Sequence, residues 1–196
     1  MAVRDDHAGP LPESVAAASP PVRSSSLEAT RRSRSRSRDR QSYLLPEPGG
    51  HMEEIFENRV RFAETDMQGI VFYGNYLTYQ DETVSEYLRR IGYGYATMEA
   101  ADWDVHVVGV DLDYRGQATF GDVVGNAIRV TAIGDASITY EYAAHRKPET
   151  DDEEPELLAE GTLTHVAVDA ATGSPTTVPE GFREAVAGFQ EEAPDR

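Results

Sequence analysis

The side chains that could perform chemistry in this chain of 196 residues are carboxylates and imidazoles, because the chain has no cysteine. Disulfides, thiolate nucleophiles and cysteine-ligated metal centres are thereby excluded. No GxSxG nucleophile elbow is present. The histidines do not follow HExxH or a similar metal-binding spacing, which disfavours a zinc enzyme: His7, His51, His106, His145 and His165. We therefore expect carboxylate chemistry with no metal and no cofactor.

Asp66 is the carboxylate whose position best suits catalysis. It follows a predicted strand, Gly69 follows it within a turn, and Asn75 stands at the start of a predicted helix. Such a carboxylate could attack a carbonyl carbon or activate a water molecule. The helix N-terminus adds positive potential beside it. Taken alone, an Asp shortly before a Gly is more often a turn former than a catalyst. Asp81 and Glu82 are further carboxylates on the predicted helix, but an acidic helix face is usually solvated, so a catalytic role for them is disfavoured.

The elements that must position Asp66 are a strand before it and a long helix after it. From Met52 onward, apolar Phe56, Val60 and Phe62 alternate with charged residues, the period of a half-buried strand. The helix is predicted over residues 76–91, and its apolar face recurs at three- and four-residue intervals: Leu77, Gln80, Val84, Tyr87, Leu88 and Ile91.

Both ends of this helix carry typical capping residues. Asn75 is the predicted N-cap, and Gly92 stands where a left-handed C-terminal cap is expected. Four further runs alternate like strands, at 105–114, 123–133, 138–146 and 157–168, and residues 179–189 indicate a short helix. A strand, a long helix and four consecutive strands predict an antiparallel sheet with the helix on one face, an α+β architecture.

The chain divides into a tail and one domain by composition. Residues 1–51 are rich in Pro, Ser, Ala and Arg, and they lack the apolar content that folding requires. We expect either a disordered tail or upstream sequence wrongly attached to a protein that starts at Met52. An RNA-binding arm is disfavoured because no aromatic residue interleaves its arginines. The domain is expected over residues 52–190, and residues 191–196 form a short acidic tail.

Charge separates the same two parts. Residues 1–51 carry eight arginines and six acidic residues, whereas residues 52–196 carry ten basic and 29 acidic residues. Lys147 is the single lysine, a composition that resembles salt-adapted proteins of the cytoplasm, although a mildly acidic mesophilic protein is the alternative. Nucleic acid is a poor partner for such a domain. We also expect no membrane association and a cytoplasmic location, because no apolar run has the length of a membrane span or a signal sequence.

The segment from Glu64 to Leu77, ETDMQGIVFYGNYL, resembles the signature of the 4-hydroxybenzoyl-CoA thioesterase family. In that family a Thr-Asp pair, a Gly three residues later, an aromatic pair and Asn-Tyr lead into the central helix. The resemblance implies a hotdog fold, with a sheet of about five strands wrapped around one long helix. It also implies acyl-CoA substrates and a homodimer or homotetramer with the active site at a subunit interface.

The resemblance assigns catalytic roles to Asp66, Gly69, Asn75 and the backbone N–H of Tyr73. Asp66 would be the nucleophile or the general base, and the Tyr73 N–H would bind the oxyanion at the start of the helix. Relatives place His or Pro where this chain has Gly74, so the acyl preference, aromatic or aliphatic, stays open. Candidates for contacts to the CoA phosphates are Arg89, Arg90, Arg115, Arg129, Arg146 and Lys147.

Two other classes of function remain open at this point. A hotdog hydratase or dehydratase would need a catalytic His paired with a carboxylate near the helix, and no such pair is visible. A non-catalytic acyl-CoA-binding protein would keep the fold without hydrolysis. Release of CoA thiol distinguishes a thioesterase from both.

Overall fold

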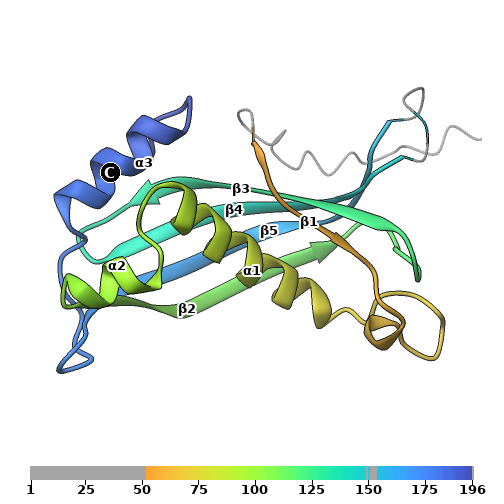
Figure 1. The fold of residues 1–196 in the computed structure, drawn as a ribbon, viewed down its shortest axis with the longest axis horizontal. Helices are drawn as coiled ribbons and strands as arrows, with labels where there is room; N and C mark the ends of the chain where they lie inside the picture. Colours follow the sequence, from red (N-terminus) through yellow and green to blue (C-terminus); the bar gives the residue numbers. More distant parts are fainter. Residues whose placement is uncertain (1–51, 149, 151–153, 196) are drawn as a thin grey trace, which may run out of the picture. The chain divides into compact units, whose positions relative to one another are not determined.

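The computed structural model describes residues 52–148, 150 and 154–195, so the predictions for residues 1–51 lie outside the described part. Within it, a five-stranded antiparallel sheet packs on one face against a long helix, α1 (Figure 1). The strand order is β1-β3-β4-β5-β2. The strands are β1 (Glu54–Arg59), β2 (Trp103–Tyr114), β3 (Val123–Ile133), β4 (Ser137–Arg146) and β5 (Glu156–Asp169). The helices are α1 (Asn75–Arg90), α2 (Tyr95–Ala100) and α3 (Glu180–Phe189). The predicted α+β architecture is confirmed.

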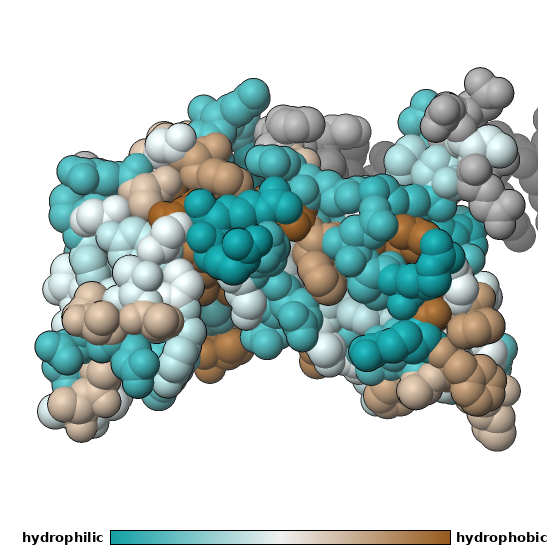
Figure 2. Space-filling model, in the orientation of Figure 1, coloured by the Kyte–Doolittle hydropathy of each residue, from teal (hydrophilic) through white to brown (hydrophobic). Residues whose placement is uncertain are grey.

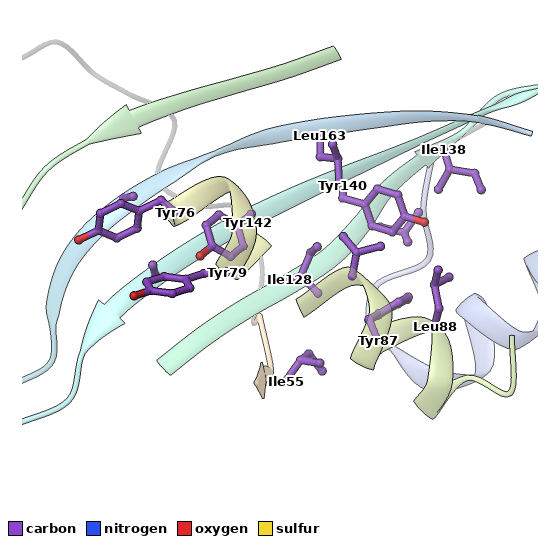
Figure 3. Packing of buried hydrophobic residues seen from close by; sticks show 14 of the residues in the cluster. Ile55, Tyr76, Tyr79, Tyr87, Leu88, Ile128, Ile138, Tyr140, Tyr142 and Leu163 are labelled. Carbon is purple, nitrogen blue, oxygen red and sulfur yellow. The ribbon is translucent and has the colours of Figure 1, made fainter. Parts of the chain in front are cut away.

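Helix α1 is placed by a buried stripe at helical spacing. The buried residues are Tyr76, Tyr79, Gln80, Thr83, Val84, Tyr87 and Leu88, and those labelled in Figure 3 lie against buried residues of the sheet. The prediction that Leu77 joins this face is wrong: Leu77 is 45% exposed, because the stripe is centred on Tyr76 and Gln80. At about 1.5 Å per residue, the 16 residues of α1 span about 24 Å.

The C-terminal end of α1 follows the prediction for Gly92. This glycine has φ +81°, in the left-handed region. Its N–H donates to the Arg89 carbonyl at 3.2 Å, and the Tyr93 N–H donates to the Leu88 carbonyl at 2.8 Å. This pair of bonds is the Schellman arrangement, which satisfies carbonyls that the helix itself leaves without partners. The short helix α2, which periodicity did not predict, begins at Tyr95.

The first strand differs from its prediction. A bulge between Glu54 and Phe56 shifts the register of β1 against β3, and Ile55 and Val60 are buried. Phe62, expected on the buried face, belongs to a 3-10 helix (Phe62–Glu64) and is 78% exposed. The bulge adds the buried Ile55 to the inward side of the strand. Val60 is buried as predicted, whereas Phe62 lies beyond the end of β1, where the period of two no longer applies.

The C-terminal residues pair with the sheet instead of projecting as a tail. The Asp195 N–H donates to Thr131 and the Ile133 N–H donates to the Asp195 carbonyl, at 2.8 and 2.9 Å. Gln190 bonds both backbone groups of Val130 and accepts the hydroxyl of Tyr87. Residues 190–195 therefore tie α3 to both β3 and α1.

Strand β2 lies at one edge of the sheet, with β5 on one side and no strand of the described chain on the other. Along this edge Val107, Val108 and Val110 are exposed by 53%, 61% and 43%. A long edge strand with apolar side chains and unpaired backbone groups is a template for another strand.

Candidate active site

Asp66 lies in a tight turn between the first strand and α1. Its backbone N–H donates to the Ile70 carbonyl at 2.8 Å, and its carbonyl accepts the Gly69 N–H at 3.0 Å. Its carboxylate Oδ1 accepts the Gln68 N–H at 2.7 Å. Thr65 and Val71 form a bridge that closes the base of the turn. The Asp66 side chain is half-buried, and one of its oxygens is committed to the turn.

Gly69 is required for its backbone conformation. Its φ of +78° lies in the left-handed region that side-chain-bearing residues disfavour. A Cβ added there would meet no atom within 4 Å. The constraint on Gly69 is therefore its backbone conformation and not a lack of space for a side chain.

Asn75 holds the turn instead of capping the helix. Asn75 is the first residue of α1, Gly74 occupies the N-cap position, and no side chain caps the helix. The Asn75 Nδ2 group donates to the Glu64 carbonyl at 2.7 Å. The same carbonyl accepts the Phe72 N–H at 2.9 Å. The prediction of an N-cap is wrong, and the structure shows a bond that links the helix start to the residue two before Asp66.

Glu64 is a buried carboxylate that sequence reasoning missed. It is 7% exposed, and Arg61 donates to it from its backbone N–H at 2.7 Å and from its guanidinium at 2.7 and 3.0 Å. Burial raises the pKa of Glu64, but the bonds from Arg61 outweigh burial and hold that pKa below its usual value. The i,i+3 spacing of Arg61 and Glu64 was the available signal. This ion pair fixes the entrance to the turn.

Tyr73 presents a backbone N–H at the start of α1 for which the described residues supply no hydrogen-bond acceptor. Its carbonyl accepts the Tyr114 hydroxyl at 3.1 Å and the Tyr76 N–H at 3.3 Å. The carbonyl is thus held on two sides, which orients the peptide groups around Tyr73. A fixed N–H beside a helix N-terminus is a suitable donor to a developing oxyanion.

A cavity of about 270 Å³ opens beside this peptide. Its walls combine the turn with the end of β2 and the residues that follow: Ile70, Val71, Tyr73, Tyr76, Tyr114, Arg115, Gly116 and Gln117. The buried Tyr76 hydroxyl has no hydrogen-bond partner among the described residues. Burial raises the pKa of Tyr76 to about 12, so this hydroxyl is a neutral donor. Asp66 does not line this cavity; its backbone N–H donates to the carbonyl of Ile70, which does.

Large apolar side chains surround the turn on the surface. Exposed fractions run from 44% for Phe72 to 101% for Met67, and the group also includes Phe62, Tyr73, Leu77 and Phe120. Figure 2 shows brown side chains gathered at the end of the domain where this turn lies. An exposed apolar group of this kind is typical of a binding or subunit surface.

Gly74 leaves room for the ring of Phe72. A Cβ at position 74 would come within 2.8 Å of Phe72 Cε1. The Phe72 ring packs against Tyr73 with centroids 4.4 Å apart. The glycine at position 74, where the family has another residue, therefore lets the Phe72 ring pack against Tyr73, whose N–H is the candidate oxyanion donor.

The other side chains considered from the sequence lie elsewhere. His165 is buried in β5 beside Tyr140, and burial lowers its pKa to about 4 against the opposing charges of Asp81 and Asp104. No group of three His, Cys, Asp or Glu side chains in the described residues could hold a metal ion. None of the described helices has the length and apolar character needed to cross a membrane.

Comparison with known proteins identifies the family. Residues 60–186 match the model of the thioesterase-like superfamily. A Bacillus subtilis (strain 168) protein named "Putative acyl-CoA thioesterase YneP" is 25% identical over 126 residues, which cover 64% of this chain and 87% of that protein. The crystal structure of hypothetical protein TT1821 from Thermus thermophilus has a TM-score of 0.62 and 28% identity, covering 70% of this chain and 100% of that one.

The fold also recurs in Slr0204, a 1,4-dihydroxy-2-naphthoyl-CoA thioesterase from Synechocystis. That structure has a TM-score of 0.60 and 19% identity, and the match covers 68% of this chain and 95% of that one. The sheet wrapped around α1 is a hotdog fold, and the chain belongs to the thioesterase-like superfamily.

Proposed function

We propose that this protein hydrolyses acyl-CoA thioesters to a free acid and CoA, with Asp66 as the catalytic carboxylate. The carrying observation is the pairing on one loop of a half-buried carboxylate with an N–H, that of Tyr73, which lacks an acceptor among the described residues. Membership of the thioesterase-like superfamily supports the same activity.

A thioester suits a site with one carboxylate. The leaving thiol should have a pKa of about 8.5, like that of cysteine, so its thiolate departs without a strong general acid. Asp66 either attacks the carbonyl carbon, which expels CoA and leaves an acyl-aspartyl anhydride for water to cleave, or removes a proton from the attacking water. In both routes the carbonyl oxygen becomes negative and the Tyr73 N–H donates to it.

Pairing of two copies along β2 would complete this site. Tyr114 and Arg115, which line the cavity, stand at the end of the exposed edge strand. We infer a homodimer or a larger homo-oligomer that adds a second sheet edge beside the cavity. Val108→Lys should separate the copies, because it places a charge among the apolar side chains of the edge. Light scattering would measure the mass; an unchanged oligomer would refute this pairing, and a monomeric wild type would refute the oligomer itself.

Release of CoA thiol from a panel of aromatic and aliphatic acyl-CoAs tests the proposed function. Because the chain has no cysteine, a thiol reagent reports product without background from the protein. We expect turnover on at least one acyl class. A purified, folded protein that binds acyl-CoA and releases no thiol would be a binding protein, and one that consumes only an enoyl or hydroxyacyl group would be a hydratase or dehydratase.

A further inference from the structure

The backbone carbonyl of Glu64 connects the two parts of the turn that carry the proposed catalytic groups. It accepts the Phe72 N–H at 2.9 Å and Asn75 Nδ2 at 2.7 Å, so both of its lone pairs are used. These two donors flank Tyr73 in the chain, whereas Asp66 follows Glu64 by two positions. Glu64 is therefore bonded to the segment that carries the oxyanion donor and lies close in the chain to the catalytic carboxylate.

Asn75 extends this connection to the peptide group that contains the Tyr73 N–H. That peptide group consists of the Phe72 carbonyl and the Tyr73 N–H, and its carbonyl accepts the Asn75 backbone N–H at 2.8 Å. Because a peptide group is planar, a bond to its carbonyl restrains the direction of its N–H. Asn75 therefore holds the donor peptide with its main chain, while its side chain is bonded to Glu64.

The Glu64 side chain anchors this arrangement in the interior. The residue is 7% exposed, and its carboxylate accepts three N–H groups of Arg61, at 2.7, 2.7 and 3.0 Å. Its own N–H donates to the Arg61 carbonyl at 3.0 Å. Burial of a carboxylate is costly unless hydrogen bonds compensate. Three charge-assisted bonds compensate here, and they fix the position of the side chain.

Polar side chains of α1 and the sheet support Glu64 from the core. The Tyr79 hydroxyl is buried without a hydrogen-bond partner among the described residues. Burial, and after it the charge of Glu64, raises the pKa of Tyr79, which keeps this hydroxyl neutral. In Figure 3 the hydroxyl oxygens of Tyr79 and Tyr142 point toward the same end of the core. Asn126 accepts the Tyr142 hydroxyl at 2.7 Å and donates to Asn58 at 2.9 Å, and bonded polar groups in a core favour a single arrangement.

We propose that Glu64 is a positioning residue that orients the Tyr73 N–H toward the carbonyl oxygen of the substrate through Asn75. The inference rests on the proposed function, since it adds a residue to the same site. Glu64 does not touch the substrate; its ion pair with Arg61 fixes the carbonyl from which Asn75 and the donor peptide are held. A donor stabilises an oxyanion best when it is fixed before the reaction. Loss of the ion pair should therefore weaken binding of the transition state and leave binding of the ground state unchanged.

The test compares Glu64→Gln and Asn75→Ala with wild type in the thiol-release assay. Glu64→Gln keeps the shape of the side chain and removes its charge, and Asn75→Ala removes the bond to the Glu64 carbonyl. We expect kcat to fall about tenfold in each variant, with KM within about twofold of wild type. Glu86→Gln is the matched control, because Glu86 also accepts two guanidinium N–H groups from an arginine three positions away, Arg89, but lies near the other end of α1.

A double variant separates positioning from independent damage. If Glu64 acts through Asn75, Glu64→Gln combined with Asn75→Ala should lose kcat about ten- to twentyfold, whereas independent effects would multiply to about 100-fold. Asn75→Ala combined with Glu86→Gln should behave like Asn75→Ala alone. Losses that multiply in the first pair, or a KM that rises as much as kcat falls, would overturn the proposal.

Amide hydrogen exchange, followed by NMR at the Phe72 and Asn75 N–H groups, tests the arrangement without catalysis. We expect faster exchange at both amides in Glu64→Gln and wild-type exchange in Glu86→Gln. A wild type that releases no thiol but shows this pattern would refute the hydrolase and retain the role of Glu64 in holding the donor peptide. Unchanged exchange at these amides, or exchange raised equally throughout the domain, would overturn that role while turnover in the wild type upheld the hydrolase.

Discussion

Replacement of Asp66 by Asn should separate the charge of this side chain from its structural bond. Asp66 Oδ1 accepts the Gln68 N–H at 2.7 Å, and the amide oxygen of Asn can accept the same bond. Asp66→Asn therefore removes the negative charge and retains the turn. We expect kcat to fall at least 100-fold, about 2.7 kcal/mol at 1.36 kcal/mol per factor of ten.

Asp66→Ala removes both the charge and the bond to Gln68. An exposed hydrogen bond of this kind contributes about 0.5–1 kcal/mol. The melting temperature of Asp66→Ala should therefore fall by about 1 to 4 °C, while that of Asp66→Asn stays at the wild-type value. Both variants should lose kcat to a similar extent, because catalysis depends on the ionised carboxylate.

The assay is thiol release at saturating acyl-CoA, run beside a thermal melt of each purified variant. Near-wild-type kcat in Asp66→Asn would refute the catalytic role. Loss of kcat in Asp66→Ala together with normal kcat in Asp66→Asn would assign Asp66 to the turn alone. The pair of variants thus distinguishes a catalyst from a turn former, the two interpretations that the sequence allowed.

Three further predictions concern the site, the core and the surface. Tyr114→Phe should lower kcat about fivefold at nearly constant stability, because the Tyr73–Gly74 peptide loses the 3.1 Å bond to its carbonyl and the adjoining peptide, which carries the Tyr73 N–H, is then held less firmly. An unchanged kcat would contradict this. His165, whose folded-state pKa is lowered to about 4 from 6.5, stays neutral in the fold while the unfolded chain takes a proton. The stability that neutral His165 allows is thus complete above about pH 6.5 and is lost as pH falls towards 4. Urea unfolding should therefore show that the free energy of unfolding of His165→Gln falls less steeply than that of wild type over this window, with slopes that differ by up to about 1.4 kcal/mol per pH unit. The KM for acyl-CoA should fall between about 0.1 and 1 M salt, because the Debye length shrinks from about 10 to 3 Å and screens the acidic domain from the phosphates, whereas a rising KM would count against salt adaptation.

The fold could be predicted closely because its elements have clean periodicities. The strands expected at 123–133 and 138–146 agree with β3 and β4 to within one residue, and Gly92 ends α1 as its type predicts. The first strand was predicted, but its details were not: the bulge that buries Ile55 depends on pairing with β3, a long-range contact that no local pattern encodes, and the strand ends before Phe62.

The candidate site was predictable in its residues more than in its contacts. The motif identified the turn and the helix start, yet Asn75 holds the Glu64 carbonyl instead of capping α1. The ion pair of exposed Arg61 with buried Glu64 was missed because exposed ion pairs with the same spacing are common on acidic surfaces. The catalytic assignment of Asp66 and the Tyr73 N–H stays a prediction.

The contact between Gly74 and Phe72 limits how acyl selectivity could be engineered in this protein. A histidine or proline grafted at position 74 would have to displace the Phe72 ring, since even a methyl group would approach its edge to 2.8 Å. That ring packs on Tyr73, so the graft would disturb the residue whose N–H is the proposed oxyanion donor. A transplant of specificity from relatives would therefore need coordinated redesign of positions 72 and 74, and a library varying both together is the practical route to new substrates.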